Sequence, residues 1–299
     1  MSASSLGYQA AKPAAGPAGA LSLSVGFSGG RTEPVRTESV GVLRLMKPHY
    51  LDDSGQVTYI VVNPGGAYFG EACRMDVEVL PGASLVLASQ GATRIYRTPH
   101  EPAVQEAVFR VGAGARFEYV PEQTIAYRDA DYRQVTELVV APDAQAFIGE
   151  IVTPGWDPEG TPFTYTAMRL RLDVRVDGPA PSSPGGGLVC SDNVRVVPAA
   201  IGEGMSGIGH MEGASHMGSV LVVGTHTAAV AYVDGVREVV SALGMERAGV
   251  TTGSRHGVSW LMVRALADST DALHALVYGV NEFDRAATTG QRRLDLRRY

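Results

Sequence analysis

Three glutamates follow tight turns in the first half of the chain and are the side chains best suited to transient metal chemistry. Glu71 ends the glycine-rich segment NPGGAYFGE, Glu122 follows a second turn, and Glu150 follows a third. If the flanking strands stack, we expect these carboxylates to approach one another. Carboxylate oxygens can pass a divalent cation onward without trapping it, unlike thiolates. The same residues also fit ordinary solvated turns, so both interpretations stay open.

A second set of potential ligands lies in the segment GMSGIGHMEGASHMGS, which carries His210 and His216 among methionines. Imidazole suits nickel or zinc. The spacing of the two histidines matches neither one helix face nor a compact metal loop, so a glycine-rich connector is the favoured interpretation. The two cysteines, Cys73 and Cys190, form no CxxC motif. They argue against a disulfide framework or a cysteine zinc site and fit a reduced, cytoplasmic setting.

The sequence lacks the common signatures of catalysis. It contains no GxxxxGK[ST] phosphate loop, no GxGxxG between a strand and a helix, no GxSxG and no HExxH. A net charge of −6 argues against a nucleic-acid partner, because phosphate affinity comes mainly from clustered Lys and Arg. No stretch approaches the roughly 18 apolar residues of a membrane span, so no membrane partner is expected.

The elements that must position these side chains are mostly strands. Segments such as LSLSVGF, VTYIVVN, MDVEVL and LRLRLDVRV alternate apolar and polar residues between Gly and Pro breaks over 21–175. Three segments each have the pattern of two strands joined by a tight turn, and the turns end at Ala83, Ala115 and Ala144. Repeats near 30 residues suggest stacked units with a shared core. A mainly β fold with stacked, solenoid-like strands is therefore predicted, although any β-rich chain yields similar hairpins.

Two helices are predicted near the C-terminus. The first spans 234–243, with Asp234 as its N-cap, and the second spans 270–285; both carry an apolar stripe at helical spacing. Residues 1–20 are small and proline-containing and lack the apolar core of a signal peptide, which predicts a flexible tail. Residues 21–299 are predicted to form a single β-rich domain.

The ordered segments NPGGAYFGE, GASLVLASQGATRIYR, GARFEYVPEQTI and NEFDRAATTGQRRLDLRRY resemble the urease accessory protein UreD family, also called UreH. The resemblance implies a non-enzymatic maturation factor with a mainly β fold. It implies a UreF-type accessory protein, a UreG-type GTPase and the urease apoenzyme as partners. It also implies nickel in transit, with no tightly bound cofactor, and an internal passage as the nickel route. The alternative is a β-rich enzyme or ligand-binding protein of unknown substrate, which would act without partners.

The resemblance carries over residue by residue. Glu71 stands where the family has aspartate, and Glu150 matches an acidic position, so both are candidates for the nickel route. Trp156 departs from the family's arginine, which puts contacts at that corner in doubt. The remaining matched positions are candidates for partner or loop contacts: Pro64, Gly65, Gly66, Gly70, Thr93, Arg94, Tyr96, Arg97, Glu122 and Gln123.

Overall fold

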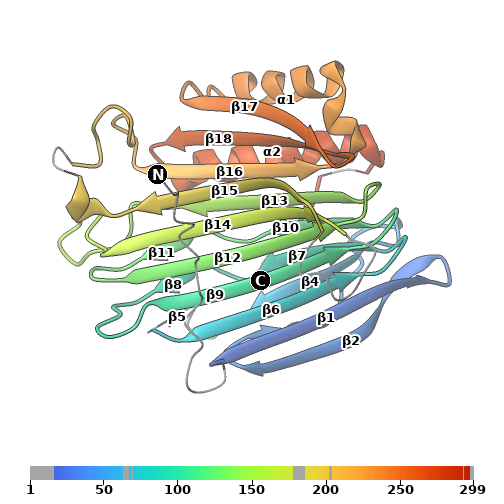
Figure 1. The fold of residues 1–299 in the computed structure, drawn as a ribbon, viewed down its shortest axis with the longest axis horizontal. Helices are drawn as coiled ribbons and strands as arrows, with labels where there is room; N and C mark the ends of the chain where they lie inside the picture. The colour runs from blue at the N-terminus through green and yellow to red at the C-terminus, as the bar shows by residue number, and fades with distance from the viewer. Residues whose placement is uncertain are drawn as a thin grey trace, which may run out of the picture.

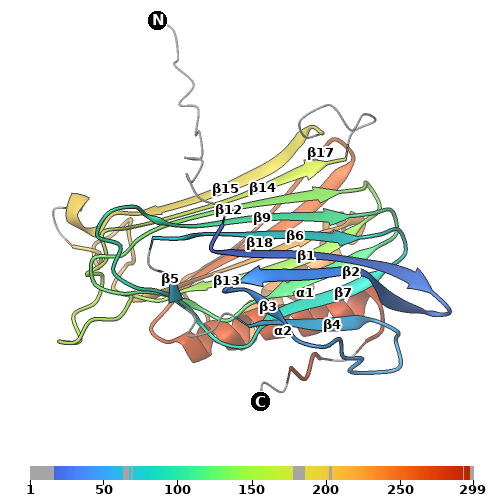
Figure 2. The same cartoon turned by 90° about the horizontal axis from the view of Figure 1, so that it is seen from below.

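The computed structural model describes residues 17–62, 67–68, 70–177, 186–201, 204–291 and 293–296. Two β-sheets pack face to face, and two helices cover the outer face of one of them, so the molecule has three layers (Figures 1 and 2). The prediction of a mainly β fold with stacked strands and two helices is confirmed.

The first sheet has seven strands in the order β15-β14-β12-β9-β6-β1-β2. Its central members run parallel, whereas β2 and β15 pair antiparallel at the two edges. The strands are β1 (Gly19–Ser28), β2 (Arg31–Gly41), β6 (Ala72–Val79), β9 (Ala103–Val111), β12 (Asp131–Val140), β14 (Ala167–Val176) and β15 (Leu188–Val196).

The second sheet has eleven strands, eight of which follow the order β17-β18-β16-β13-β10-β7-β4-β3, while β11, β8 and β5 form a small parallel side face. The strands of the main path are β3 (Arg44–Leu45), β4 (Val57–Val62), β7 (Ser84–Ser89), β10 (Arg116–Val120), β13 (Gln145–Val152), β16 (His216–Val223), β17 (Ala248–Arg255) and β18 (Val258–Ala267). Those of the side face are β5 (Ala67–Tyr68), β8 (Thr93–Ile95) and β11 (Thr124–Ala126).

The turn repeat predicted from the sequence sets the stacking of the strands. The backbone N–H of Arg116 donates to Ala83 O, and that of Gln145 donates to Ala115 O, both at 2.9 Å. Ala83, Ala115 and Ala144 are each 1% exposed, because the next turn of chain covers them. The repeat thus reflects true stacked coils rather than independent hairpins, and alanine is small enough for the coils to pack closely.

The two helices differ in how well the sequence predicted them. α2 (Thr270–Thr288) begins where expected, and the Ser269 side chain accepts a hydrogen bond from the N–H of Ala272. α1 (Val230–Ala242) begins four residues before Asp234, so the prediction of Asp234 as its N-cap is wrong. Asp234 instead accepts an exposed bond from Arg237 at 3.0 Å. Tyr232 and Val233 are buried in the apolar layer beneath α1, which extends the helix toward its N-terminus.

Two glycines let α2 lie close to the second sheet. A Cβ added at Gly149 of β13 would come 2.7 Å from Val277, and one added at Gly218 of β16 would come 2.8 Å from Leu273. Such distances are not sterically tolerated without movement. The absent side chains therefore set the depth at which α2 packs.

Candidate functional site: a polar cavity between the sheets

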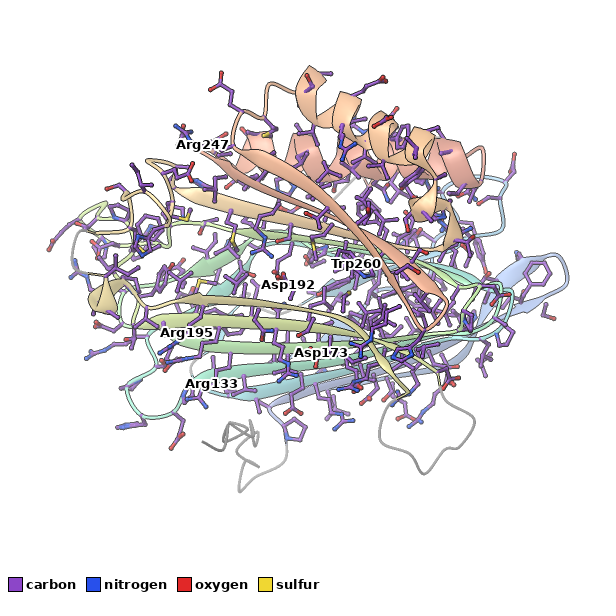
Figure 3. The ribbon with its side chains drawn as sticks, turned by 45° about the horizontal axis from the view of Figure 1, so that its top comes forward. Arg133, Asp173, Asp192, Arg195, Arg247 and Trp260 are labelled. Atoms are coloured by element: carbon purple, nitrogen blue, oxygen red, sulfur yellow. The ribbon has the colours of Figure 1, made fainter. Side chains whose placement is uncertain are left out.

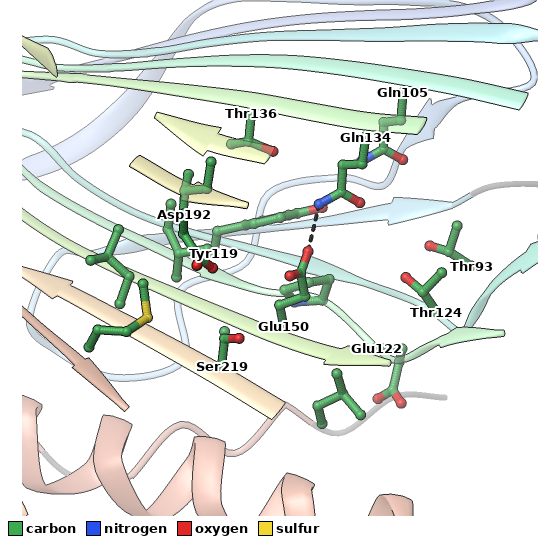
Figure 4. A pocket seen from close by; sticks show the side chains of 17 residues that line it. Thr93, Gln105, Tyr119, Glu122, Thr124, Gln134, Thr136, Glu150, Asp192 and Ser219 are labelled. Atoms are coloured by element: carbon green, nitrogen blue, oxygen red, sulfur yellow. Dashed lines mark hydrogen bonds between the residues drawn. The ribbon is translucent and has the colours of Figure 1, made fainter. Parts of the chain in front are cut away.

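A small cavity lies between the two sheets, close to where β13 and β16 face β12 and β15 (Figure 4). Its volume, as the space open to the centres of water molecules, is about 40 Å³, enough for a few waters. The side chains that line it are mostly polar, which is unusual for the centre of a β-sandwich. They include Gln105, Tyr119, Glu122, Thr124, Gln134, Thr136, Glu150, Asp192 and Ser219.

Glu150 is the ionisable group at the centre of this cavity. Gln134 Nε2 donates to its Oε1 at 2.6 Å, as the dashed line in Figure 4 marks. The pKa of Glu150 is raised to about 7, chiefly by burial among protein atoms; the bond from Gln134 and the charge of Arg264 oppose the shift, and nearby Asp192 adds to it. The cavity still leaves part of the side chain open to water. A carboxyl group whose pKa lies near 7 can release its proton at neutral pH and bind a cation in its place.

An ion pair between the sheets borders the cavity. Arg264 of β18 donates from Nη2 to Asp192 of β15, and Figure 3 shows Asp192 between the two sheets. Ser219, opposite Glu150 in the β13–β16 ladder, is buried, yet its hydroxyl has no hydrogen-bond partner in the described part of the protein. An unpaired buried hydroxyl costs about 1–3 kcal/mol. This hydroxyl therefore points to a water or an ion in the cavity.

The cavity adjoins two larger hollows. A hollow of about 250 Å³ lies at the seam between β15 and β17 and is here called the seam hollow. It shares four residues with the cavity lining: Leu172, Asp192, Leu221 and Met262. A wider hollow of about 990 Å³ beside α2, here the helix-side hollow, shares Glu122 with it. The inner cavity thus shares lining residues with both hollows.

The structure separates the glutamates that the sequence grouped together. Glu122 and Glu150 line the same cavity, whereas Glu71 is not among its lining residues. Glu71 is half-buried just before β6, where its carbonyl accepts the N–H of Val104 at 2.8 Å. Pro64, Gly65 and Gly66 lie outside the described residues.

Gly70 is the described glycine of the same loop, and its backbone requires glycine. Its φ is 95°, and a Cβ there would come 2.7 Å from Glu101 O. L side chains rarely adopt this conformation, and the contact leaves them no room. The predicted role of Gly70 in shaping the loop before Glu71 therefore has a steric basis, while any partner contact stays a prediction.

The predicted run from Thr93 to Arg97 divides between cavity and surface. Thr93 of β8 lines the cavity, and its N–H donates to Gln123 O at 2.9 Å. Arg94 and Arg97 are exposed, and Arg97 reaches Asp129 only at 3.5 Å. The run thus supplies one group to the cavity and two cations to the surface.

An aromatic row runs down the side face next to these cations. The Tyr96 and Tyr127 ring centroids are 4.6 Å apart, and those of Tyr127 and Trp156 are 4.8 Å apart. Trp156 is half-exposed. Trp156 therefore extends this row by one aromatic side chain.

Glu122 and Gln123 meet a histidine that the sequence did not single out. His274 Nε2 on α2 lies 3.1 Å from Glu122 Oε2 and 3.3 Å from Gln123 Oε1. Burial lowers the pKa of His274, although the charge of Asp271 opposes the shift. All three residues line the helix-side hollow.

The histidine and methionine segment gives no comparable cluster. Met205, Met211 and Met217 are buried in the core between the sheets, while His210 is exposed and His216 contacts Ser215. In the described ranges no group of three or more His, Cys, Asp and Glu side chains could hold a metal ion. No helix of the described chain is long and apolar enough to cross a membrane.

Sequence reasoning missed Gln134, Asp192, Ser219 and Arg264. The period-two alternation of β12 gave part of the answer. In DYRQVTELVV, Gln134 occupies one of the alternate positions whose side chains face the core. A polar residue on such a phase marks either a buried hydrogen bond or a polar cavity. Nothing in the sequence paired these positions with Glu150, because they lie on strands that meet only in the folded chain.

Comparison with known proteins identifies relatives over nearly the whole chain. The family model for UreD urease accessory protein matches residues 17–298. A protein named urease accessory protein UreD from Arthrobacter sp. (strain FB24) is 41% identical over 95% of this chain and 94% of its own length. Proteins of the same name from Actinomyces naeslundii and Kocuria rhizophila are 42% and 40% identical, over 94% and 98% of this chain and 98% and 92% of their own lengths.

The family model and relatives at this identity extend across the two sheets, the cavity and α2. The chain belongs to the UreD family of urease accessory proteins.

Proposed function

We propose that this chain is a non-enzymatic scaffold that, with UreF-type and UreG-type partners, delivers nickel to the active site of the urease apoenzyme. The observation that carries the proposal is the polar cavity, in which Glu150 lies with Gln134, Asp192 and Ser219 between two otherwise apolar sheet faces. An interior lined in this way suits the passage of a hydrated cation better than it suits simple packing.

The donor chemistry supports transit rather than storage. The groups that line the cavity offer oxygen atoms, and carboxylate oxygen binds first-row cations more weakly than thiolate does. Cys190 lines the seam hollow, but burial and the charges of Asp192 and Asp173 raise the pKa of its thiol to about 12. A raised thiol pKa disfavours the thiolate that would bind nickel tightly, because the ion must then displace a firmly held proton. An ion that enters such a passage is therefore free to leave it.

The non-enzymatic part of the proposal rests on the residue chemistry. The cavity offers no nucleophile paired with a base: Ser219 Oγ has no hydrogen-bond partner among the described residues. Its small volume leaves little room for an organic substrate. The expected behaviour is dependence on partners, with no turnover by the chain alone.

The nickel content of urease matured in cells tests the proposal. Glu150→Gln keeps the size of the side chain and an oxygen for Gln134, but it removes the carboxylate from the cavity. We expect at least a severalfold loss of nickel in urease while the accessory complex still assembles, as judged by co-purification. Glu238→Gln, an exposed position on α1, is the matched control and should leave nickel unchanged.

Two results contradict the proposal. Full nickel loading of urease with Glu150→Gln would show that nickel delivery does not need the cavity carboxylate. Loss of the complex with its partners would make Glu150 structural. Glu71→Ala in parallel tests the other predicted glutamate, which lies outside the cavity lining. If urease loses nickel with Glu71→Ala but not with Glu150→Gln, the nickel route runs through the loop before β6.

A further inference from the structure

The strongest unassigned grouping of metal donors lies in the helix-side hollow, where α2 meets the loop between β10 and β11. Three donor atoms converge there: Nε2 of His274, Oε2 of Glu122 and Oε1 of Gln123. His274 and Glu122 have side chains about one-fifth exposed, at 20% and 19%, so both are reachable from the hollow yet held by packing.

The separation of these atoms fits one shared ion. Donors bound to a first-row cation at about 2.1 Å lie roughly 3.0–3.4 Å from each other. Nε2 is 3.1 Å from the carboxylate oxygen and 3.3 Å from the amide oxygen. A cation can therefore bind at Nε2 in the tautomer that carries the ring proton on Nδ1, with little movement of the side chains.

The backbone around the donors is fixed before any ion arrives. The Glu122 N–H donates to Ser89 Oγ at 2.8 Å, and Gln123 O accepts the N–H of Thr93 at 2.9 Å. On the helix side, Leu273 is fully buried next to His274 and packs against the glycine surface of β16. Preorganised donors lose little freedom on binding, which favours a site with few ligands.

The charge of the hollow favours a cation. Among the described residues, its lining carries three carboxylates, Glu122, Asp271 and Asp295, against one guanidinium, Arg293. Clefts lined by one sign of charge raise the local concentration of the opposite ion. Glu122 also lines the inner cavity, so an ion held at this point is next to the side chains around Glu150.

We propose that His274, Glu122 and Gln123 form a binding site for a divalent first-row cation, through one nitrogen and two oxygens, at the mouth of the cavity. The identity of the ion as nickel rests on the proposed function; the site itself does not. Three donors leave the remaining coordination positions to water, so the ion exchanges readily. The site is a loading point and not a store.

Nickel binding by the full-length chain tests this site directly. Equilibrium dialysis with NiCl2 measures affinity, and nickel X-ray absorption reports whether an imidazole is bound. We expect His274→Gln, which keeps an amide that can donate to Glu122, to weaken nickel binding at least tenfold and to remove the imidazole scattering. Glu122→Gln should weaken it severalfold. His100→Ala, at an exposed loop position, is the matched control and should change neither signal.

Each result decides the inference. Unchanged affinity and imidazole scattering in His274→Gln overturn it, as does a wild-type chain that binds no nickel at millimolar concentration. Thermal unfolding by circular dichroism shows whether His274→Gln and Glu122→Gln remain folded. Gln123→Glu adds a negative charge at the same position and should tighten nickel binding. Unchanged or weaker nickel binding by Gln123→Glu would contradict the site. The urease nickel content of Glu150→Gln is scored separately, so the loading site and the proposed delivery function can fail independently.

Discussion

Arg285 of α2 donates from Nη1 to Oε1 of Glu118 on β10 at 2.6 Å, and neither side chain exposes more than 1% of its surface. Asn281 donates to the other carboxylate oxygen at 2.8 Å, and Gln56 accepts from the same guanidinium at 2.8 Å. This buried pair ties the helix layer to the second sheet. It therefore holds α2, and with it His274, against the strands that line the cavity.

Loss of one partner of this pair should be strongly destabilising. Arg285→Met removes one of the two buried guanidinium groups that pair with Glu118, the other being Arg116 at 2.8 Å, and breaking a buried pair in this way costs up to about 3–5 kcal/mol. Urea unfolding followed by circular dichroism measures the change. Arg237→Met, which removes an exposed pair on α1, should cost about 1 kcal/mol or less. Equal losses in the two variants would show that the buried pair has no special role.

Adding one methyl group at Gly149 should push α2 away from the sheet. The new Cβ would lie 2.7 Å from Val277, so Gly149→Ala should lower the free energy of unfolding by about 1–3 kcal/mol. Gly249→Ala is the control, because a Cβ on that strand of the same sheet meets nothing within 4 Å. The double variant Gly149→Ala with Val277→Ala should recover part of the loss. A neutral Gly149→Ala would rule out steric control of the helix depth.

The ionisation of Glu150 should make stability fall as pH rises. Its pKa is about 7 in the folded chain, against an ordinary value near 4.5, because burial disfavours the carboxylate. Between these values the folded state binds more protons than the unfolded state, so its stability decreases with pH until about pH 7 and then levels off. After allowance for water in the cavity, the loss is on the order of 2 kcal/mol.

Comparison with Glu150→Gln isolates this effect. The variant lacks the titrating group, so its stability relative to the wild type should increase between pH 5 and pH 8. Chemical unfolding of both proteins at these two pH values provides the measurement. A difference between the two proteins that stays constant with pH would mean that Glu150 titrates in its ordinary range.

Neither thiol should react in the folded protein. Cys73 is 1% exposed, and the pKa of Cys190 is raised to about 12 by burial and two neighbouring carboxylates, so almost no thiolate exists at pH 8. Labelling with a thiol-reactive disulfide reagent should be slow in buffer and fast in guanidinium. Rapid labelling of the folded chain that disappears in Cys190→Ser would contradict this assignment.

Local sequence patterns predicted the architecture well, because they reflect packing that repeats. Period-two alternation marks strands that bury one face, and the spacing of Ala83, Ala115 and Ala144 records how many residues complete one coil. The start of α2 was predicted from its apolar stripe, and the structure adds the Ser269 cap. The start of α1 was not, because Ala229, its actual N-cap, makes no side-chain capping bond and apolar burial sets where the helix begins.

The candidate sites depended on tertiary structure. The sequence singled out Glu71, Glu122 and Glu150 by their places after turns, but only Glu122 and Glu150 reach one cavity, because the three residues occupy different parts of the coil. Asp192 and His274 are far from them in sequence. The antiparallel return of β15 brings Asp192 to the cavity, and the packing of α2 on two glycines brings His274 to Glu122.

The sequence by itself therefore determined the strands, the coil spacing and the family, since each follows from residues close together along the chain. Tertiary structure decided which polar side chains share a space, since that depends on how sheets and helix pack across many intervening residues. Side chains on strands are only a few ångströms from their cross-strand neighbours, and no local pattern encodes which neighbours those are.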